Sequence, residues 1–322
     1  MATSKKRDIA QDIAKAIGIL AVVYAHVLWG LVSSSIFADG NPLHFIDMGL
    51  QIYTMPLFFL LAGYNAPSSL KRSTPAEFIR KRASMLIPVY LIWSVVQGGM
   101  KYALSGQVND PVTLQDLLAI PYKPIGQFWF LYALLIYHIA TALLYRRPWV
   151  LASLAIAAFL ANPWLEDFPR DYCYSGIFYV LGFLLANKDL PSIKAKHIAP
   201  ALGVAVIVYA CGLAMNWSYG LDSRNLLLLP ATLSGIGLVM FLSQKLSASS
   251  AGPALAYVGR ASLAIYVLHV ICFAGWRAFI LKLGVTEAYV HLVTGTLVGL
   301  GVPLLLYSVL GRFKLRRYAY LG

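Results

Sequence analysis

Apolar blocks of about 20 residues recur along the whole chain, and they constrain its fold more than any other feature. A helix rises about 1.5 Å per residue, so about 20 residues cross the hydrocarbon core of a bilayer. Hydrophobic residues make up 59% of the 322 residues and charged residues 12%, against about 45–50% and about 25% in an ordinary soluble domain. Too few polar residues remain to cover a soluble surface. The sequence predicts an all-α, polytopic transmembrane helical bundle and excludes a soluble protein.

The blocks divide the chain into ten predicted spans. The N-terminal block, residues 13–32, follows a basic start but is too long for the apolar region of a signal peptide, so we expect a retained first span. The longest connection, residues 104–124, is too short to fold alone, and we expect one integral-membrane domain over residues 1–322. The predicted spans are 13–34, 45–66, 83–103, 125–145, 148–164, 172–187, 197–216, 225–243, 256–281 and 289–311.

Lys and Arg are distributed unequally between the two sets of connections. With an even number of spans both termini lie on one side, which holds 19 of the 26 Lys and Arg residues, whereas the other side holds 6 and Lys15 lies within the first span. Cytoplasmic loops carry the excess of positive charge. The sequence therefore predicts that both termini are cytoplasmic and that the protein is a multi-pass protein of a bacterial inner (plasma) membrane. The net charge of +13 needs no nucleic acid to explain it.

The sequence lacks the motifs of metal sites and of bound cofactors. The sequence has three cysteines, Cys173, Cys211 and Cys272, which lie far apart and form no CxxC motif. Neither a disulfide framework nor a metal site is therefore expected. No His, Asp and Glu residues occur with ligand spacing, and there is no nucleophile elbow, phosphate-binding loop or dinucleotide fingerprint. We expect no metal and no bound cofactor.

The first span carries three ionisable residues on one helical face. Asp12 and Lys15 are three residues apart, and Lys15 and His26 differ by eleven residues, which leaves only about 20° between them around the helix axis. His26 lies roughly 16 Å deeper than Lys15. A helix start neutralised by an ion pair, with a structural histidine, is one interpretation. In the other interpretation, Asp12 and Lys15 form a polar entrance at the cytoplasmic end of the span and His26 is a general base near mid-membrane, because imidazole exchanges protons near neutral pH.

A second deep histidine, His269, lies in the ninth predicted span. Ser262 and His269 are seven residues apart and share a face with Tyr266 between them. Helix packing alone can explain such a set, whereas two mid-depth histidines in different spans favour a shared polar site. The remaining histidines are interpreted as interfacial or structural: His44, His138, His197 and His291.

Two further segments are candidates for binding. Arg80, Lys81 and Arg82 form a basic cluster in the connection that leads into the third span. They can act as a topology signal or attract a phosphate-rich cytoplasmic ligand. Trp129 opens the fourth span from the outer side, where interfacial aromatic anchors are common.

These segments together resemble the acyltransferase 3 family of membrane O-acyltransferases. The resemblance rests on Asp12 and Lys15 leading to His26, the segment Pro56–Tyr64, the basic connection 78–88, Trp129-Phe130-Leu131 and the segment Ser262–His269, in the family's order. Within the family, the chain is similar to the fucose O-acetylase-like and surface-polysaccharide O-acetyltransferase branch. It departs from the family at Lys15, where much of the family has Arg, and at Met85, where many members have a further Arg.

The resemblance implies an acyltransferase that moves an acyl group, most often acetyl, from cytoplasmic acyl-CoA to a sugar hydroxyl of a cell-surface or lipid-linked glycan. His26, with Asp12 and Lys15, would be catalytic, His26 as general base or transient acyl carrier. Acyl-CoA would be a co-substrate that binds at Arg80, Lys81 and Arg82. The acceptor or the rest of the site would involve Ser262, Tyr266, His269 and Trp129.

Two other classes use the same residues differently. A transporter or flippase for a lipid-linked saccharide or small solute would use the buried polar residues for binding or proton coupling, although the chain has no evident internal repeat. A non-catalytic scaffold or sensor explains the spans but leaves the aligned residues Asp12, Lys15 and His26 unused. Consumption of acyl-CoA separates an acyltransferase from both.

Overall fold

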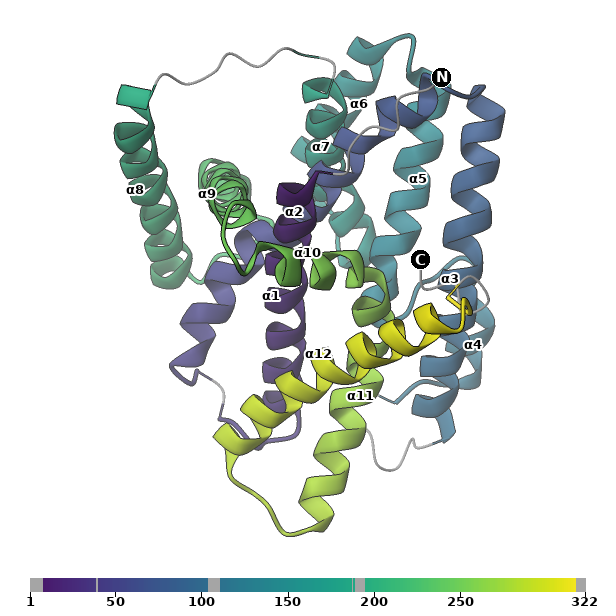
Figure 1. Cartoon of the computed structure of the whole chain (residues 1–322), viewed down its shortest axis with the longest axis vertical. Coiled ribbons are helices and arrows are strands. Elements are labelled where there is room, and N and C mark those ends of the chain that lie inside the picture. Colours follow the sequence, from purple (N-terminus) through teal and green to yellow (C-terminus); the bar gives the residue numbers. More distant parts are fainter. Residues whose placement is uncertain (1–7, 39, 104–110, 187, 189–194, 317–322) are drawn as a thin grey trace. The chain divides into compact units, whose positions relative to one another are not determined.

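The structure is a computed structural model that describes residues 8–38, 40–103, 111–186, 188 and 195–316 (Figure 1). These residues form α-helices and short 3-10 helices and contain no strand, so the predicted all-α fold is confirmed. The α-helices are α1 (Ile9–Ser33), α2 (Leu43–Leu70), α3 (Pro75–Ala103), α4 (Leu114–Ala119), α5 (Trp129–Leu144), α6 (Pro148–Ala161), α7 (Asp167–Leu185), α8 (Ala195–Tyr219), α9 (Leu229–Ser247), α10 (Gly252–Arg260), α11 (Ser262–Lys282) and α12 (Ala288–Arg312), and the 3-10 helices are η1 (Gly126–Phe128), η2 (Asn162–Trp164) and η3 (Leu226–Leu228).

Eight helices in the described part of the chain are long and apolar enough to cross a membrane, which makes this a multi-pass membrane protein. They are α1, α2, α3, η1 with α5, α8, η3 with α9, α11 and α12. Two predicted spans differ from these. Residues 148–164 form the shorter apolar pair α6 and η2, and α7 begins with the charged residues Asp167, Arg170 and Asp171. The count of ten spans and the cytoplasmic termini therefore stay predictions.

The ninth predicted span, residues 256–281, is wrong as a single helix. It consists of α10 and α11, which meet at Ala261. The amide of Ala261 donates to the carbonyl oxygens of Tyr257 at 3.1 Å and Val258 at 3.0 Å, so the turn tightens and closes α10 there. Because α10 has nine residues, it is too short to cross a bilayer, and the membrane-length helix begins at Ser262.

Helix α3 begins before the predicted limit of residue 83. Pro75 is its first residue, a position where proline is favoured because its missing N–H would have no partner in the helix. The Thr74 amide donates to Glu77 Oε2 at 2.8 Å, and the Glu77 amide donates to Thr74 Oγ1 at 3.3 Å. This reciprocal cap fixes the start of the helix. The basic cluster therefore lies on the first turns of α3 and not in a connection, which corrects the sequence prediction.

The chain folds into two compact units, each built from separated segments. The first unit contains the described parts of residues 1–54, 193–223 and 227–322. Its centre is α1, which packs against α9, α10, α11 and α12, while α11 lies beside α12 and α8 beside α9 (Figure 1). The α1 side chains that face this packing are apolar and fully buried, among them Ile13, Ile19 and Leu28.

The second unit contains the described parts of residues 55–192 and 224–226, and thus the later part of α2 together with α3 to α7. Its tightest contact joins α2 and α7, where two glycines allow the backbones to meet. A Cβ atom at Gly63 would lie 1.9 Å from the Tyr179 carbonyl oxygen, and one at Gly182 would lie 2.0 Å from the Leu60 carbonyl oxygen. Small residues at such crossings let membrane helices approach closely. A single domain over residues 1–322 stays a prediction.

Candidate functional site

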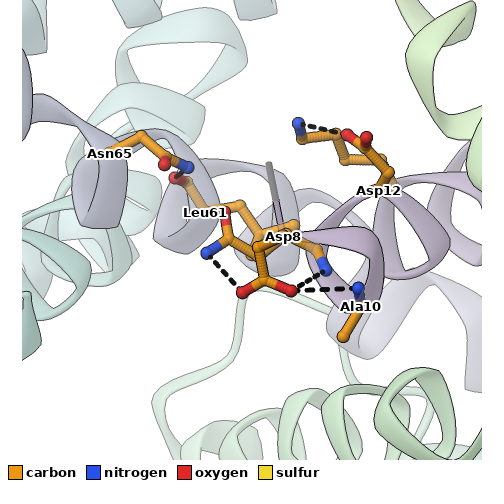
Figure 2. Close-up of polar contacts among 7 residues, drawn as sticks. Asp8, Ala10, Asp12, Leu61 and Asn65 are labelled. Atoms are coloured by element: carbon orange, nitrogen blue, oxygen red, sulfur yellow. Dashed lines mark hydrogen bonds and ion pairs between the residues drawn. The ribbon is translucent and has the colours of Figure 1, made fainter. Parts of the chain in front are cut away.

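The polar residues of the candidate site begin at the start of α1. Asp8 caps this helix, because its Oδ1 accepts from the amides of Ala10 at 3.0 Å and Gln11 at 3.3 Å (Figure 2). The cap satisfies amides that have no partner within the helix and places a negative charge at the positive end of its dipole. It therefore fixes where the helical face that carries the predicted site residues begins.

Asp12 and Lys15 form the predicted pair on that face. Lys15 Nζ donates to Asp12 Oδ1 at 3.3 Å (Figure 2). Asp12 is 2% exposed, whereas the Lys15 side chain is 29% exposed. Helix α10 covers the Asp12 backbone so closely that a Cβ atom at Gly259 would lie 1.7 Å from the Asp12 carbonyl oxygen. Tight packing thus fixes the backbone at Asp12, whose carboxylate is buried, whereas the Lys15 side chain is partly exposed.

His26 lies seventeen residues into α1 with a defined tautomer. Its Nδ1 is 2.8 Å from the Val22 carbonyl oxygen, and since a carbonyl only accepts, Nδ1 carries the proton. The neutral ring therefore has its lone pair on Nε2. The side chain is half-buried. This arrangement presents Nε2 as the proton acceptor, which is the requirement for a general base.

His269 is brought against His26, as the sequence favoured. The ring centroids are 5.0 Å apart, and the rings are nearly perpendicular at 86°. His269 is fully buried, and its Nδ1 donates to the carbonyl oxygens of Tyr266 at 2.8 Å and Ile265 at 3.0 Å. Its Nε2 is buried and has no hydrogen-bond partner among the described residues. Two imidazoles with acceptor Nε2 atoms thus lie together inside the first unit.

Tyr266 and Ser262 occupy different positions relative to this pair. The buried Tyr266 ring lies 6.4 Å from the His269 ring, centroid to centroid. Ser262 is the first residue of α11, about 10 Å along the helix axis from His269. The structure therefore brings Tyr266 beside the histidine pair and places Ser262 two turns away from it.

Three residues that the sequence analysis did not select extend the cluster. The Trp29 ring lies 4.8 Å from the His26 ring, and its Nε1 donates to Asp47 Oδ2 at 2.8 Å. Gln51 Nε2 donates to the same carboxylate oxygen at 2.7 Å. Asp47 is 1% exposed. A sequence signal was present, because a carboxylate and an amide four residues apart on an apolar helix mark a polar face.

The basic cluster and Trp129 lie in the second unit. Arg80 and Lys81 are exposed on α3. Arg82 turns inward: its guanidinium carbon lies 5.2 Å from the centroid of the Phe78 ring, and its Nη2 donates to Ser69 Oγ at 3.1 Å. The three cations are therefore not equivalent, since two can meet a ligand from solution and Arg82 is part of the helix packing.

Trp129 is the first residue of α5, directly after η1. Two reciprocal hydrogen bonds fix this turn, because Gln97 Nε2 donates to Gln127 Oε1 at 3.1 Å and Gln127 Nε2 donates to Gln97 Oε1 at 2.7 Å. The Trp129 ring contacts those of Phe59 at 5.9 Å and Tyr172 at 6.4 Å. Its surroundings are aromatic packing within the second unit.

The other histidines divide by burial. His138 and His291 are buried and hydrogen-bonded, His138 Nδ1 to the Tyr179 hydroxyl at 2.7 Å and His291 Nε2 to the Val285 carbonyl oxygen at 2.9 Å. His44 and His197 are exposed. In the part of the chain that the structure describes, no group of three or more His, Cys, Asp or Glu side chains could hold a metal ion.

Comparison with known proteins identifies the family. The model of the acyltransferase 3 family, described as an acyltransferase domain, matches residues 8–308. This chain belongs to that family. The match begins at the cap of α1 and includes every candidate site residue named above, in both units.

Two curated relatives are similar to this chain. Nodulation protein NolL of Mesorhizobium japonicum is 30% identical over 192 residues, which cover 58% of this chain and 50% of the relative. Nodulation protein NolL of Sinorhizobium fredii is 26% identical over 235 residues, which cover 71% of this chain and 62% of the relative. The aligned segments thus span about half to three-fifths of the length of these relatives. No solved structure matches the chain.

Proposed function

We propose that this protein is a membrane O-acyltransferase that moves an acyl group, most often acetyl, from cytoplasmic acyl-CoA to a sugar hydroxyl of a cell-surface or lipid-linked glycan. The membrane would be a bacterial inner membrane. The observation that carries the proposal is the orientation of His26. Its Nδ1–H is bound to the Val22 carbonyl oxygen, and its ring contacts the ring of His269. The family assignment supports acyl transfer as the reaction.

In the proposed reaction His26 Nε2 accepts the proton of the acceptor hydroxyl. The hydroxyl oxygen forms a bond to the thioester carbonyl carbon, the carbon–sulfur bond breaks, and the thiolate of CoA takes the proton from the imidazolium. The products are an ester and free CoA, so atoms and charge balance. General base catalysis of this kind contributes about 10²–10⁴-fold to a rate. An acyl-imidazole on His26 is the alternative route through the same atom.

The neighbours of His26 support this role. Protonation of His26 creates a charge in an apolar region, where hydrogen bonding to a neighbouring acceptor lowers its cost. The buried Nε2 of His269 is an acceptor without a partner among the described residues, and its ring is in contact with His26. We therefore assign His269, with Tyr266 beside it, to completion of the site around the base.

The donor would approach from the basic side of the membrane. CoA carries phosphates that pair with cationic side chains, and Arg80 and Lys81 are exposed and available for such a contact. Arg82 lies inward against the Phe78 ring, so its proposed role is to stabilise α3, the helix that carries Arg80 and Lys81. The pair Asp12 and Lys15 would set the charge at the start of α1, along whose polar face the thioester would move toward His26.

Transfer of label from radiolabelled acetyl-CoA in membrane vesicles tests the proposal. The comparison is wild type against His26→Ala, with the exposed His197 changed to Ala as the matched control. Label is expected to enter a glycan or lipid-linked sugar with wild type and His197→Ala, and to fall at least about a hundredfold with His26→Ala. Retained transfer by His26→Ala at equal protein level ends the assignment of the base. If wild type neither transfers label nor releases CoA, the proposed donor is wrong, and solute flux becomes the next assay.

A further inference from the structure

Asp47 is a buried carboxylate whose position needs a reason. It is 1% exposed inside α2, where a carboxyl group is costly unless its oxygens are hydrogen-bonded. Its Oδ2 accepts from both Trp29 Nε1 and Gln51 Nε2. Its Oδ1 is buried with no partner in the described part of the chain. Such an atom is an acceptor that a ligand hydroxyl can satisfy.

The two hydrogen bonds of Asp47 Oδ2 determine how Trp29 is held. Trp29 is 42% exposed, its N–H is bound to a carboxylate inside the protein, and its ring contacts the ring of the proposed base, His26. At the next residue, the Gly30 carbonyl oxygen accepts a hydrogen bond from Arg277. The indole is therefore a fixed, partly open aromatic surface in contact with the ring of the proposed base.

We propose that Trp29 is the stacking surface for the sugar ring of the acceptor, with Asp47 and Gln51 as the residues that position it. This inference rests on the proposed function, since it assigns the ring whose hydroxyl His26 deprotonates. A pyranose has an apolar face of C–H groups that packs on an indole, and hydroxyl groups at its edge that bind carboxylates. Asp47 Oδ1, an acceptor without a partner among the described residues, belongs to the carboxylate that binds the Trp29 N–H.

The alternative for an exposed tryptophan near a span end is a lipid anchor. Such a residue keeps its N–H toward water and headgroups. Trp217, near the end of α8, has that character: it is 50% exposed, contacts the Phe45 ring at 5.5 Å, and its N–H has no protein partner among the described residues. Trp29 differs because its N–H is directed inward. Trp217 is therefore the matched control for a role of Trp29 that goes beyond anchoring.

Equilibrium binding and turnover of soluble sugars provide the test. The probes are tritiated methyl glycosides of fucose, rhamnose, galactose, glucose and N-acetylglucosamine, with the purified full-length protein in detergent. Wild type is expected to bind at least one of them without any acyl donor. Trp29→Leu is expected to weaken that binding about tenfold, the effect of one lost stacking contact. Trp217→Leu is expected to bind as wild type does.

The conservative variants separate positioning from folding. Asp47→Asn keeps an oxygen for the Trp29 N–H, so it is expected to weaken binding less than Asp47→Leu, which removes both hydrogen bonds. In turnover with acetyl-CoA, Trp29→Leu is expected to raise the KM for the glycoside about tenfold and leave the KM for acetyl-CoA unchanged. A merely structural role would lower kcat through loss of folded protein and would not change one KM alone.

Each outcome separates this inference from the proposed function. If wild type binds a glycoside through Trp29 but transfers no acetyl group, the sugar surface stands and the acyl-CoA reaction is wrong. If wild type transfers acetyl groups to a glycoside and Trp29→Leu has an unchanged KM, the reaction stands and the sugar surface is overturned. Absence of binding to all five glycosides, or equal losses in Trp29→Leu and Trp217→Leu, also overturns it.

Discussion

Replacing Gly259 with alanine tests the contact that holds Asp12. The added Cβ would lie 1.7 Å from the Asp12 carbonyl oxygen and 2.6 Å from its carbonyl carbon. Ordinary contact distances are roughly 3.5–4 Å, so α10 and α1 must separate by roughly 2 Å. The clashing atoms are backbone atoms within a helix, which no rotamer change can move. Overpacking of this kind costs about 1–3 kcal/mol.

The assay is the melting temperature of the purified protein in detergent, with Gly301→Ala as the control. A Cβ atom at Gly301 meets nothing within 4 Å, and alanine is favoured over glycine in a helix by about 1 kcal/mol. Gly259→Ala is expected to lower the melting temperature by roughly 2–4 °C per kcal/mol, whereas Gly301→Ala raises it or leaves it unchanged. Equal melting temperatures for the two variants would refute the close approach of α10 to α1.

Three further predictions concern the second unit. Gly63→Ala and Gly182→Ala each place a Cβ within 2.0 Å of a backbone oxygen, so each is expected to lower the melting temperature by an amount like that of the Gly259 variant. Exposed Arg80 and Lys81, changed together to Gln, are expected to raise the KM for acetyl-CoA and reduce its salt dependence, with stability unchanged. Arg82→Ala is expected to lower the melting temperature, because it removes the cation–π contact and the hydrogen bond to Ser69. An unchanged KM in the Arg80 and Lys81 variant, or a fully stable Arg82 variant, would contradict these assignments.

Hydropathy predicted the positions of most helices, because a membrane-spanning helix needs a long apolar run and that run is visible in the sequence. The errors occur where capping decides the end. Thr74 and Glu77 start α3 with a reciprocal cap, a signal readable in the sequence but masked by the charged residues beside it. The break at Ala261 has no such signal, because the turn forms as α10 packs on α1 through Gly259.

Part of the candidate site was predictable from the sequence. Helical spacing and depth in the membrane favoured a shared site for His26 and His269, and their rings are in contact. The sequence analysis did not select Asp47, which lies near the start of the second predicted span. Its burial and its bond to Trp29 depend on how α2 packs on α1, which a single sequence does not specify. The spacing of Asp47 and Gln51 was the available signal.

The most direct test of the central claim is the stoichiometry of acyl transfer by the purified protein. Free CoA thiol and acetylated methyl glycoside are measured together, by a thiol reagent and by mass spectrometry, for wild type and His26→Gln. The account predicts one acetylated sugar per CoA released by wild type and a rate at least about a hundredfold lower for folded His26→Gln. Full turnover by His26→Gln, or CoA release by wild type without any acetylated sugar, would contradict it.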